Sequence, residues 1–335
     1  MINKNSVFIS TVIPTIGRAT LSRSVESVLN QQFSADGIEV IVVNDSGKML
    51  PEEEWQSNPC VKIIETNRRN RSVARNAGAA IASGQYLHFL DDDDWILPGA
   101  FEQFWKLAQD NPVDWIYGGF RLIDDSGQKL ADILPDATGN VLIQMLSFEW
   151  LPLQASIIKS EAFFSAGCFA SLDSLLGGFE DIDLSRQIAL RGDFSATNEL
   201  VAMIRIGFTS STTNYNDMFI QNRQSREKLL DAPEVFSKLR QSVRGSVDNR
   251  QYWSGRIAYY YLSSLKKNIK NKSLTKAASR GVYVVASFMT AGRNIFSAGY
   301  YRALTEPHYN RVWQAIEQVG AAHVYDGVNW NSGAS

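Results

Sequence analysis

The first half of the chain alternates short apolar runs with segments whose apolar residues recur every three or four positions. Buried β-strands are predicted for VFISTVIP (7–14), IEVIVVND (38–45), VKIIE (61–65), YLHFL (86–90) and VDWIYGG (113–119). Helices are predicted for LSRSVESVLNQQF (21–33) and for SVARNAGAAIASG (72–84), whose small residues permit close packing on a sheet. This alternation predicts an α/β fold whose mostly parallel sheet is covered by helices on both faces.

Beyond about residue 200 the pattern becomes helical, with Lys and Arg interspersed. Helices are predicted for 217–231, 233–244, 249–267, 273–292 and 307–319. We therefore divide the chain into an α/β domain, residues 1–215, and a helical C-terminal extension, residues 216–335. The run Tyr259 to Tyr261 has two interpretations, namely packing between helices or contact with another subunit or a membrane surface. Since three adjacent tyrosines exceed what one buried face needs, we expect a homo-oligomer or a membrane-surface contact through these helices.

Composition narrows the class of protein. The hydrophobic fraction of 44%, the charged fraction of 20% and a net charge of −2 are typical of a globular protein, with no global field that would attract nucleic acid. Cys60 and Cys168 lack the spacing of a zinc site. The stretch from Gly281 to Gly292 is shorter than the roughly 20 residues that span a bilayer. We expect a cytoplasmic protein that can associate peripherally with the membrane face.

Four adjacent carboxylates, Asp91 to Asp94, follow the strand predicted at 86–90, and Asp45 ends another strand. In open parallel sheets, ligands bind beyond the carboxyl ends of the strands. Because side chains alternate along an extended chain, Asp91 and Asp93 point the same way, an arrangement that suits Mg²⁺ or Mn²⁺ together with a substrate phosphate. An exposed acidic loop without a ligand is the alternative.

A second acidic group opens a predicted helix within GGFEDIDLSRQIALRG (177–192). Glu180, Asp181 and Asp183 lie in its first turn, where the helix dipole alone favours acids, so simple capping is one interpretation. The preceding Gly177 and Gly178 would let the backbone approach a ligand closely. A carboxylate at this position could instead serve as a general base, if folding brings it near the metal.

Together these stretches resemble the family 2 glycosyltransferases. The resemblance covers roughly residues 5 to 205 and includes VFISTVIPTIGR, IEVIVVNDSG, the ARN helix that leads through a strand to DDDD, and the later ED-x-DL. It implies the GT-A fold, a Rossmann-like and mostly parallel sheet flanked by helices. Nucleotide-sugar binding would then lie in residues 1–120, and the acceptor side with the catalytic base in residues 120–215.

The family's roles carry over to matching positions. The resemblance implies that Asp181 is the catalytic base and that Glu180 and Asp183 support it. It implies that Asp93 binds Mn²⁺ or Mg²⁺ directly, while Asp91 contacts the ribose or a metal-bound water. The nucleotide-sugar contacts that it implies are Pro14, Thr15, Asp45 (at the base, commonly uracil), Arg75, Asp91 and Asp92.

The sequence departs from the family pattern at a few positions. Asn44-Asp45 stands where relatives often have two acids, and His88, His308 and His323 match no metal-binding motif. The Gln-x-x-Arg-Trp signature of processive synthases is absent, so single additions are expected.

The resemblance implies inverting, metal-dependent transfer of a sugar from a nucleotide-sugar, with UDP favoured, to a hydroxyl of a glycan, lipid-linked or cell-surface polymer. Two alternatives remain. One is a non-catalytic glycan-binding or scaffold protein on the same fold. The other is a sugar nucleotidyltransferase, although that enzyme would need a Gly-rich phosphate loop where this chain reads PTIGRAT.

Overall fold

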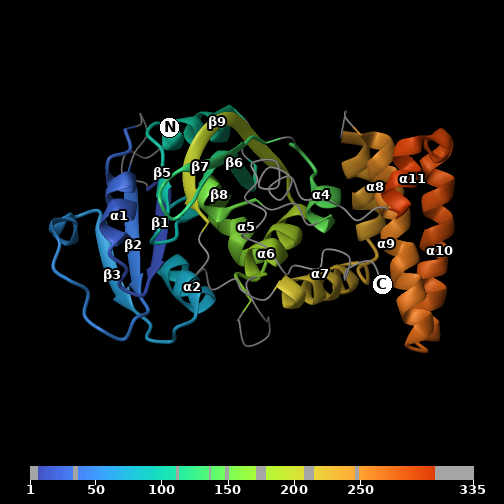
Figure 1. The fold of residues 1–335 in the computed structure, drawn as a ribbon, viewed down its shortest axis with the longest axis horizontal. Helices are drawn as coiled ribbons and strands as arrows, with labels where there is room; N and C mark the ends of the chain where they lie inside the picture. The colour runs from blue at the N-terminus through green and yellow to red at the C-terminus, as the bar shows by residue number, and fades with distance from the viewer. Residues whose placement is uncertain are drawn as a thin grey trace.

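The computed structural model describes residues 7–32, 37–110, 113–135, 137–147, 151–170, 179–206, 215–245 and 249–305. An α/β layer structure occupies one end of the molecule and a cluster of helices the other (Figure 1). The predicted helix at 307–319, the two late histidines, and the pair Gly177 and Gly178 lie outside the described residues.

The sheet holds the described strands in the order β3-β2-β1-β4-β8-β6-β9-β5, with β7 paired to β6. Its first half is parallel, as the sequence predicts, because β2 and β4 flank β1 and β3 follows β2. These strands are β1 (Ile9–Thr15), β2 (Ile38–Asn44), β3 (Val61–Glu65) and β4 (Tyr86–Phe89).

The second half of the sheet is mixed. β8 (Ser156–Lys159) runs antiparallel between β4 and β6 (Trp115–Ile123), whereas β9 (Phe194–Arg205) pairs with β6 in parallel. The short strands β5 (Trp95–Ile96) and β7 (Lys129–Ile133) pair antiparallel with β9 and β6. The sheet is therefore less uniformly parallel than the alternation of strands and helices predicts.

Helices cover both faces of the sheet. On one face, α1 (Leu21–Leu29) packs on β1 and β2, whose Ile13 and Val42 share an apolar cluster with Val25, and α3 (Ala100–Asp110) packs on β9 and β6. On the other face, α2 (Arg71–Ile81) packs on Val12 and Val43. The approach of α2 is close, since a Cβ added at Gly78 would lie 2.4 Å from Val12 Cγ1. The small residues of the ARN helix thus permit this packing, as predicted.

Further helices lie along the middle of the chain. They are the 3₁₀ turn η1 (Glu54–Ser57), α4 (Leu142–Leu146), the 3₁₀ turn η2 (Leu153–Ala155), α5 (Ser160–Ser165) and α6 (Glu180–Ala189). The predicted helix with the second acidic group is α6, and Glu180 is its first residue. Arg186, fully buried in α6, donates to the carbonyl oxygens of Met145, at 2.9 Å, and Asn222. It thereby fixes α6 to α4 and to the first C-terminal helix.

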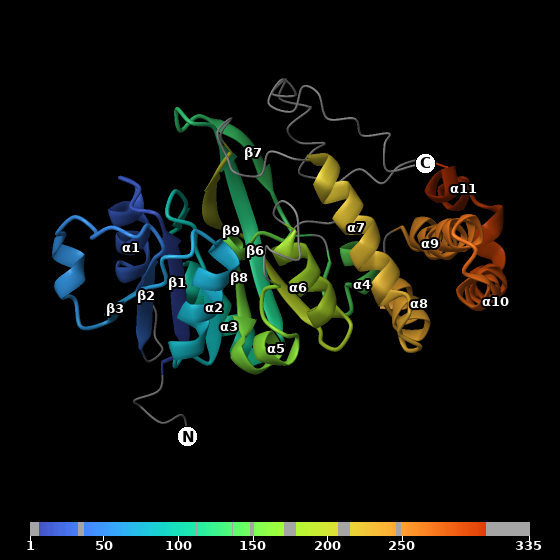
Figure 2. The same cartoon turned by 90° about the horizontal axis from the view of Figure 1, so that it is seen from below.

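The C-terminal helices are α7 (Tyr215–Leu229), α8 (Val235–Gly245), α9 (Arg250–Lys270), α10 (Leu274–Ala291), the 3₁₀ turn η3 (Gly292–Phe296) and α11 (Ala298–Thr305). Figure 2 shows α9, α10 and α11 grouped at the end of the molecule far from β3. The apolar core crosses the boundary predicted at residue 215, because one cluster joins sheet residues to Leu239 of α8 and Tyr261 of α9. None of the described helices combines the length and hydropathy that crossing a bilayer requires.

Candidate active site

The carboxylates predicted to form a site lie together at one edge of the sheet. Because β1, β2 and β4 are parallel, Thr15, Asp45 and Asp91 follow their carboxyl ends side by side. Pro14, buried in β1, is paired with Val43 of β2 and contributes backbone at the same edge. This is the edge at which open α/β sheets bind ligands.

A chain of charged side chains connects this edge to α6. Arg75 Nη2 donates to Asp91 Oδ1 at 2.6 Å, and its Nη1 donates to Glu180 Oε1 at 3.1 Å. Arg71 also pairs with Glu180, through Nε and, at 3.3 Å, through Nη2. Glu180 and Arg75 are almost completely buried, whereas the Asp91 side chain is 31% exposed. The Asp91–Arg75–Glu180 chain thus ties the strand-end carboxylates to the helix that carries Asp181.

Asp92 and Asp93 share a second arginine. Arg18 Nη1 pairs with buried Asp92 and lies 3.4 Å from Asp93 Oδ2. Thr15 Oγ1 donates to Asp92 Oδ2 at 2.6 Å and accepts from the Gly17 backbone N–H at 2.9 Å. Asp92 therefore holds the loop after β1, while the Asp93 side chain stays partly exposed, at 32%.

Asp94 points into the protein and has a structural task. Its Oδ1 accepts from the Arg205 backbone N–H at 2.7 Å, and its Oδ2 accepts from Gln154 Nε2 at 2.9 Å. The same Gln154 nitrogen donates to Asp91 Oδ2 at 2.9 Å. A buried amide thus separates two carboxylates and anchors both to η2.

The electrostatic environment differs from one aspartate to the next. Burial alone would raise the pKa of Asp91, but the Arg75 cation overrides it and lowers that pKa. Burial would lower the pKa of Arg75, yet Asp91 and Glu180 raise it, and Asp181 adds to this effect. Burial and the charges of Asp91 and Asp92 raise the pKa of Asp93 to about 6 despite Arg18. Arg18, which is shared with Asp92, therefore only partly offsets the negative charge around Asp93.

Asp45 organises the loop that precedes α2. Its Oδ1 accepts from Thr66 Oγ1 at 2.8 Å and from the Arg68 backbone N–H at 2.5 Å, and its Oδ2 accepts from the Asn70 N–H at 2.6 Å. Asn70 in turn caps α2, because its side chain accepts from the Val73 N–H. The nucleobase contact implied for Asp45 stays a prediction, for which Oδ2 retains acceptor capacity.

The three acids of α6 point to different neighbours. Glu180 binds the two arginines described above, and Asp183 accepts a hydrogen bond of 2.6 Å from Ser225 of α7. Asp181 is half-buried and accepts from the Ile182 N–H at 2.8 Å. The structure thus brings Glu180 and Asp181 to the strand-end carboxylates, whereas Asp183 contacts the helical extension.

The residues at this edge suit a hard divalent cation that also binds a substrate. The acidic side chains supply oxygen atoms as metal ligands. The raised pKa of Asp93 reflects the negative charge of the neighbouring carboxylates, which a cation would neutralise. Within the described ranges, no three His, Cys, Asp or Glu side chains are grouped as a complete metal site. A cation here would therefore need further ligands from a diphosphate and water.

Two residues that the sequence analysis did not select, Arg18 and Gln154, contact the aspartate cluster directly. Arg18 stands in PTIGRAT, a stretch that was weighed only for its lack of a Gly-rich phosphate loop, and Gln154 lies in η2 with no motif around it. Arg71, which pairs with Glu180, was not selected either. Its position one helical turn before Arg75 is the signal that could have indicated a shared partner.

The sheet, the strand-end carboxylates and the acidic helix together define a GT-A fold, and solved structures confirm it. The crystal structure of Staphylococcus aureus TarS 1–349 in complex with UDP-GlcNAc matches with a TM-score of 0.56, covering 95% of this chain and 91% of that one at 14% identity. TarS 1–349 in complex with UDP gives a TM-score of 0.53 over 84% of this chain.

Residues 10–171 match the family described as "Glycosyl transferase family 2". The poly(ribitol-phosphate) beta-N-acetylglucosaminyltransferase TarP of Staphylococcus aureus is 30% identical over 118 residues, which cover 33% of this chain and 36% of TarP. Glycosyltransferase GlyG of Streptococcus pneumoniae is 28% identical over 127 residues, 36% of this chain and 42% of GlyG. The chain thus spans well under half the length of these relatives.

Proposed function

We propose that the protein is an inverting glycosyltransferase that moves a sugar from a nucleotide-sugar to a hydroxyl of an acceptor. The observation that carries this proposal is the Asp91–Arg75–Glu180 chain, since it connects the strand-end carboxylates to the residue next to Asp181. A donor held at the sheet edge and a base on α6 would then lie in one site.

The residues have distinct tasks in this reaction. Asp181 takes the proton of the acceptor hydroxyl, and the oxygen attacks the anomeric carbon from the face opposite the diphosphate. One displacement through an oxocarbenium-like transition state inverts the anomeric configuration, so no covalent enzyme intermediate forms. Buried Arg75 keeps Asp91 ionised and positions α6 through Glu180. Asp183 supports α6 from the side of α7.

Asp93 is the proposed protein ligand of Mn²⁺ or Mg²⁺. A divalent cation bound there would neutralise the charge of the departing nucleoside diphosphate. Asp91, partly exposed and ionised by Arg75, lies two residues away and would contact the ribose or a water. Pro14, Thr15, Asp45 and Asp92 would line the nucleotide side of the site.

We propose UDP-N-acetylglucosamine as the first donor to test. TarS, which shares the fold, was crystallised with UDP-GlcNAc, and TarP is named an N-acetylglucosaminyltransferase. TarP is also named for a poly(ribitol-phosphate) acceptor, which supports a hydroxyl-bearing polymer of the cell envelope as the acceptor class here. Glycan or lipid-linked acceptors belong to the same chemistry.

Calorimetry with UDP tests the metal assignment. We expect UDP to bind well with Mn²⁺ and weakly after chelation, because Asp93 alone supplies too few ligands to hold a cation without the diphosphate. Asp93→Asn should remove most of this metal dependence. Asp110→Asn, which alters an exposed aspartate at the end of α3, is the matched control and should behave as wild type. Equal affinity with and without cation would contradict the assignment.

Release of UDP from UDP-N-acetylglucosamine separates an enzyme from a binding protein. A transferase should release UDP slowly with water as the acceptor and faster when an envelope polymer is added. A glycan-binding or scaffold protein should bind ligands without any release. A thermal-shift screen of other UDP-, GDP- and dTDP-sugars identifies the preferred donor. A ligand present at 100 times its dissociation constant adds about 2.7 kcal/mol to the free energy of unfolding, which raises the melting temperature.

A further inference from the structure

The outermost helix, α10, exposes a continuous apolar stripe. Its exposed members lie three or four residues apart, the spacing that keeps side chains on one face of a helix. They are Leu274, Ala278, Val282, Val285 and Met289, of which Leu274 is 76% exposed, Val282 66%, Val285 59% and Met289 77%. We refer to these five residues as the α10 stripe. Exposed Phe288 and Phe296 extend the apolar surface at its C-terminal end.

The α10 stripe is not part of the packing between helices. The opposite face of α10 is buried on α9 through Ala277, Arg280, Ser287 and Ala291, and Arg280 Nε donates to Ser264 of α9 at 2.9 Å. Phe288 lies at the edge of the stripe, where its ring centroid is 6.3 Å from that of Tyr300 of α11. Water-exposed Val, Leu and Met side chains in a continuous row indicate an interaction surface rather than scattered surface residues.

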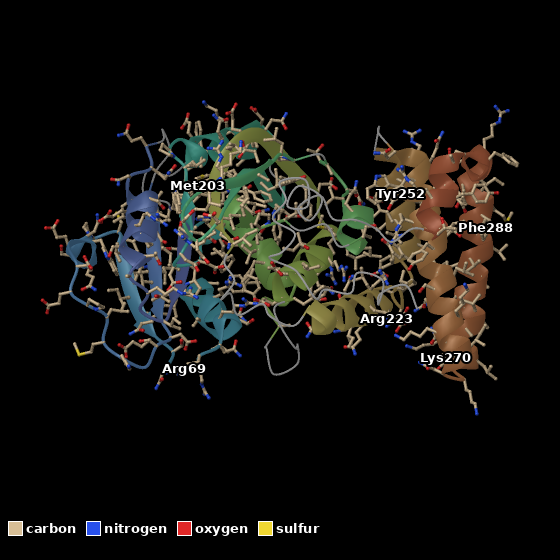
Figure 3. The ribbon with its side chains drawn as sticks, viewed as in Figure 1. Arg69, Met203, Arg223, Tyr252, Lys270 and Phe288 are labelled. Atoms are coloured by element: carbon tan, nitrogen blue, oxygen red, sulfur yellow. The ribbon has the colours of Figure 1, made fainter. Side chains whose placement is uncertain are left out.

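The charge of the surrounding helices is strongly one-sided. Residues 250–305 contain no Asp or Glu, although the whole chain has a net charge of −2. The same segment holds ten basic residues, Arg250, Arg256, Lys266, Lys267, Lys270, Lys272, Lys276, Arg280, Arg293 and Arg302. Arg256 and Arg280 are buried, and Lys276 and Arg280 pair with Asp231 just after α7, so the exposed positive charge comes from the other residues. Exposed Lys270 and Lys272 lie just before the stripe and exposed Arg293 just after it, and Figure 3 shows Lys270 at one end of the helix pair.

The tyrosine run that first suggested a contact surface has a different role. Tyr260 and Tyr261 are 1% and 0% exposed, and Tyr261 packs on Tyr283 with ring centroids 5.0 Å apart. The expectation that these tyrosines exceed what one buried face needs was therefore wrong. The surface available for contact is the α10 stripe on the neighbouring helix.

Three occupants from outside the chain could cover such a stripe, and charge decides among them. A second copy would bring two acid-free cationic helices together, and like charges oppose that contact. A soluble polyanion would match the lysines but would leave the apolar residues in water. An anionic lipid surface satisfies both, because a helix that lies in the interface buries its apolar face among the acyl chains while its Lys and Arg bind headgroups.

We propose that the α10 stripe and the basic residues beside it form a docking surface for membranes that contain anionic lipid. The proposal does not depend on the proposed catalytic function. It places the end of the molecule farthest from β3 on the lipid surface (Figure 2). Binding should combine apolar insertion with electrostatic attraction, and should therefore weaken as salt screens the charges.

Sedimentation of the full chain with lipid vesicles tests the proposal. We expect binding to phosphatidylcholine vesicles that contain phosphatidylglycerol and little binding to phosphatidylcholine alone. Val285→Ser combined with Met289→Ser should weaken binding about tenfold or more, because two inserted apolar side chains are lost. Lys270→Glu combined with Lys272→Glu should also weaken it about tenfold. Met49→Ser and Arg191→Glu, exposed in the α/β domain, are the matched controls and should bind as wild type.

Cysteine labelling shows whether something else already covers the stripe. Met289→Cys in a background with Cys60→Ser and Cys168→Ser should react rapidly with a maleimide in solution and become protected when anionic vesicles are added. Slow labelling without vesicles would mean that residues 306–335 or a second copy occupies the surface, and would overturn the proposal. So would equal binding to neutral vesicles, no binding at all, or a stripe variant that binds as tightly as wild type.

Discussion

At the scale of single residues, two adjacent acids at the start of α6 are held very differently. Glu180 is 2% exposed and accepts from both Arg71 and Arg75, so its oxygens are already committed. Asp181 is half-buried and close enough to Arg75 to raise the pKa of that guanidinium. A base must be able to reach the acceptor hydroxyl. Glu180 is thus suited to positioning and Asp181 to proton transfer.

Asp181→Asn should separate binding from chemistry. The charge of a general base matters in the transition state and little in the ground-state donor complex. We therefore expect nucleotide-sugar affinity within a few-fold of wild type and turnover lower by about 10²–10⁴. If Asp181 only stabilises the first turn of α6 through the helix dipole, losing its charge costs about 0.3–1 kcal/mol of stability and activity should survive.

Asp183→Asn is the matched control for this experiment. It removes one acid from the same helical turn, but its carboxylate contacts Ser225 of α7. We expect near-normal turnover, with a modest loss of stability from the weaker hydrogen bond. Transfer that is normal in Asp181→Asn and abolished in Asp183→Asn would show that the two roles have been assigned the wrong way round.

At the scale of elements, the loop between β3 and α2 links the nucleotide side of the site to its arginines. Asn67 and Arg69 adopt positive φ values of 48° and 49°, a conformation that costs non-glycine residues about 1–2 kcal/mol each. The Asp45 carboxylate binds backbone N–H groups on either side of Arg69 and holds this conformation. The start of α2, and hence Arg71 and Arg75, therefore depends on Asp45.

Asp45→Ala should weaken nucleotide binding by about 1.5–3 kcal/mol, the contribution of a hydrogen bond to a charged group. The dependence on the base distinguishes its two possible roles. A direct contact with uracil predicts a larger loss for UDP than for GDP or ADP in calorimetry. A role confined to the loop predicts equal losses for all three nucleotides. Unchanged binding of every nucleotide would contradict both roles.

The sequence predicts best those elements whose pattern is local. The ARN helix was predicted at 72–84 and is observed at Arg71–Ile81, because its small residues recur on one face and Asn70 caps it. Strand β8, with four residues, carries no comparable signal, and its antiparallel place between β4 and β6 depends on contacts far apart in sequence. The mixed half of the sheet could not be derived from alternation alone.

The candidate site follows the same division. Strand ends marked the positions of Asp45 and of Asp91 to Asp94, since parallel strands deliver their carboxyl ends to one edge. The hydrogen-bond partners of these acids could not be predicted, because they are distant in sequence. Gln154 contacts Asp91 at a separation of 63 residues, and Arg18 contacts Asp92 at a separation of 74 residues. Single polar residues in loops acquire such roles only through the folded arrangement.

At the scale of the whole molecule, His88 couples stability to pH. It is fully buried in β4, where its Nε2 lies 3.0 Å from the Gln154 carbonyl oxygen and its Nδ1 lies 3.1 Å from Thr11 Oγ1. The carbonyl only accepts, so Nε2 carries the proton and Nδ1 accepts from the hydroxyl. Burial lowers the pKa of His88 to about 4, although the Gln154 hydrogen bond opposes this shift.

The lowered pKa of His88 predicts a loss of stability in mild acid. Below pH 6.5 the unfolded chain binds a proton at His88 that the folded chain does not bind until about pH 4. The free energy of unfolding therefore falls across this window by about 3 kcal/mol.

Asp93 has a raised pKa and acts in the opposite sense, because its carboxylate binds a proton at a higher pH in the folded state than in the unfolded state. Other carboxyl groups also have shifted pKa values, among them Asp91 (lowered) and Asp94 (raised), so the net slope of wild type mixes several effects. His88→Gln, which can still donate to Gln154, isolates one of them: in urea unfolding between pH 7 and pH 4, wild type should lose about 3 kcal/mol relative to the variant. Parallel curves for the two proteins would mean that His88 does not control this dependence.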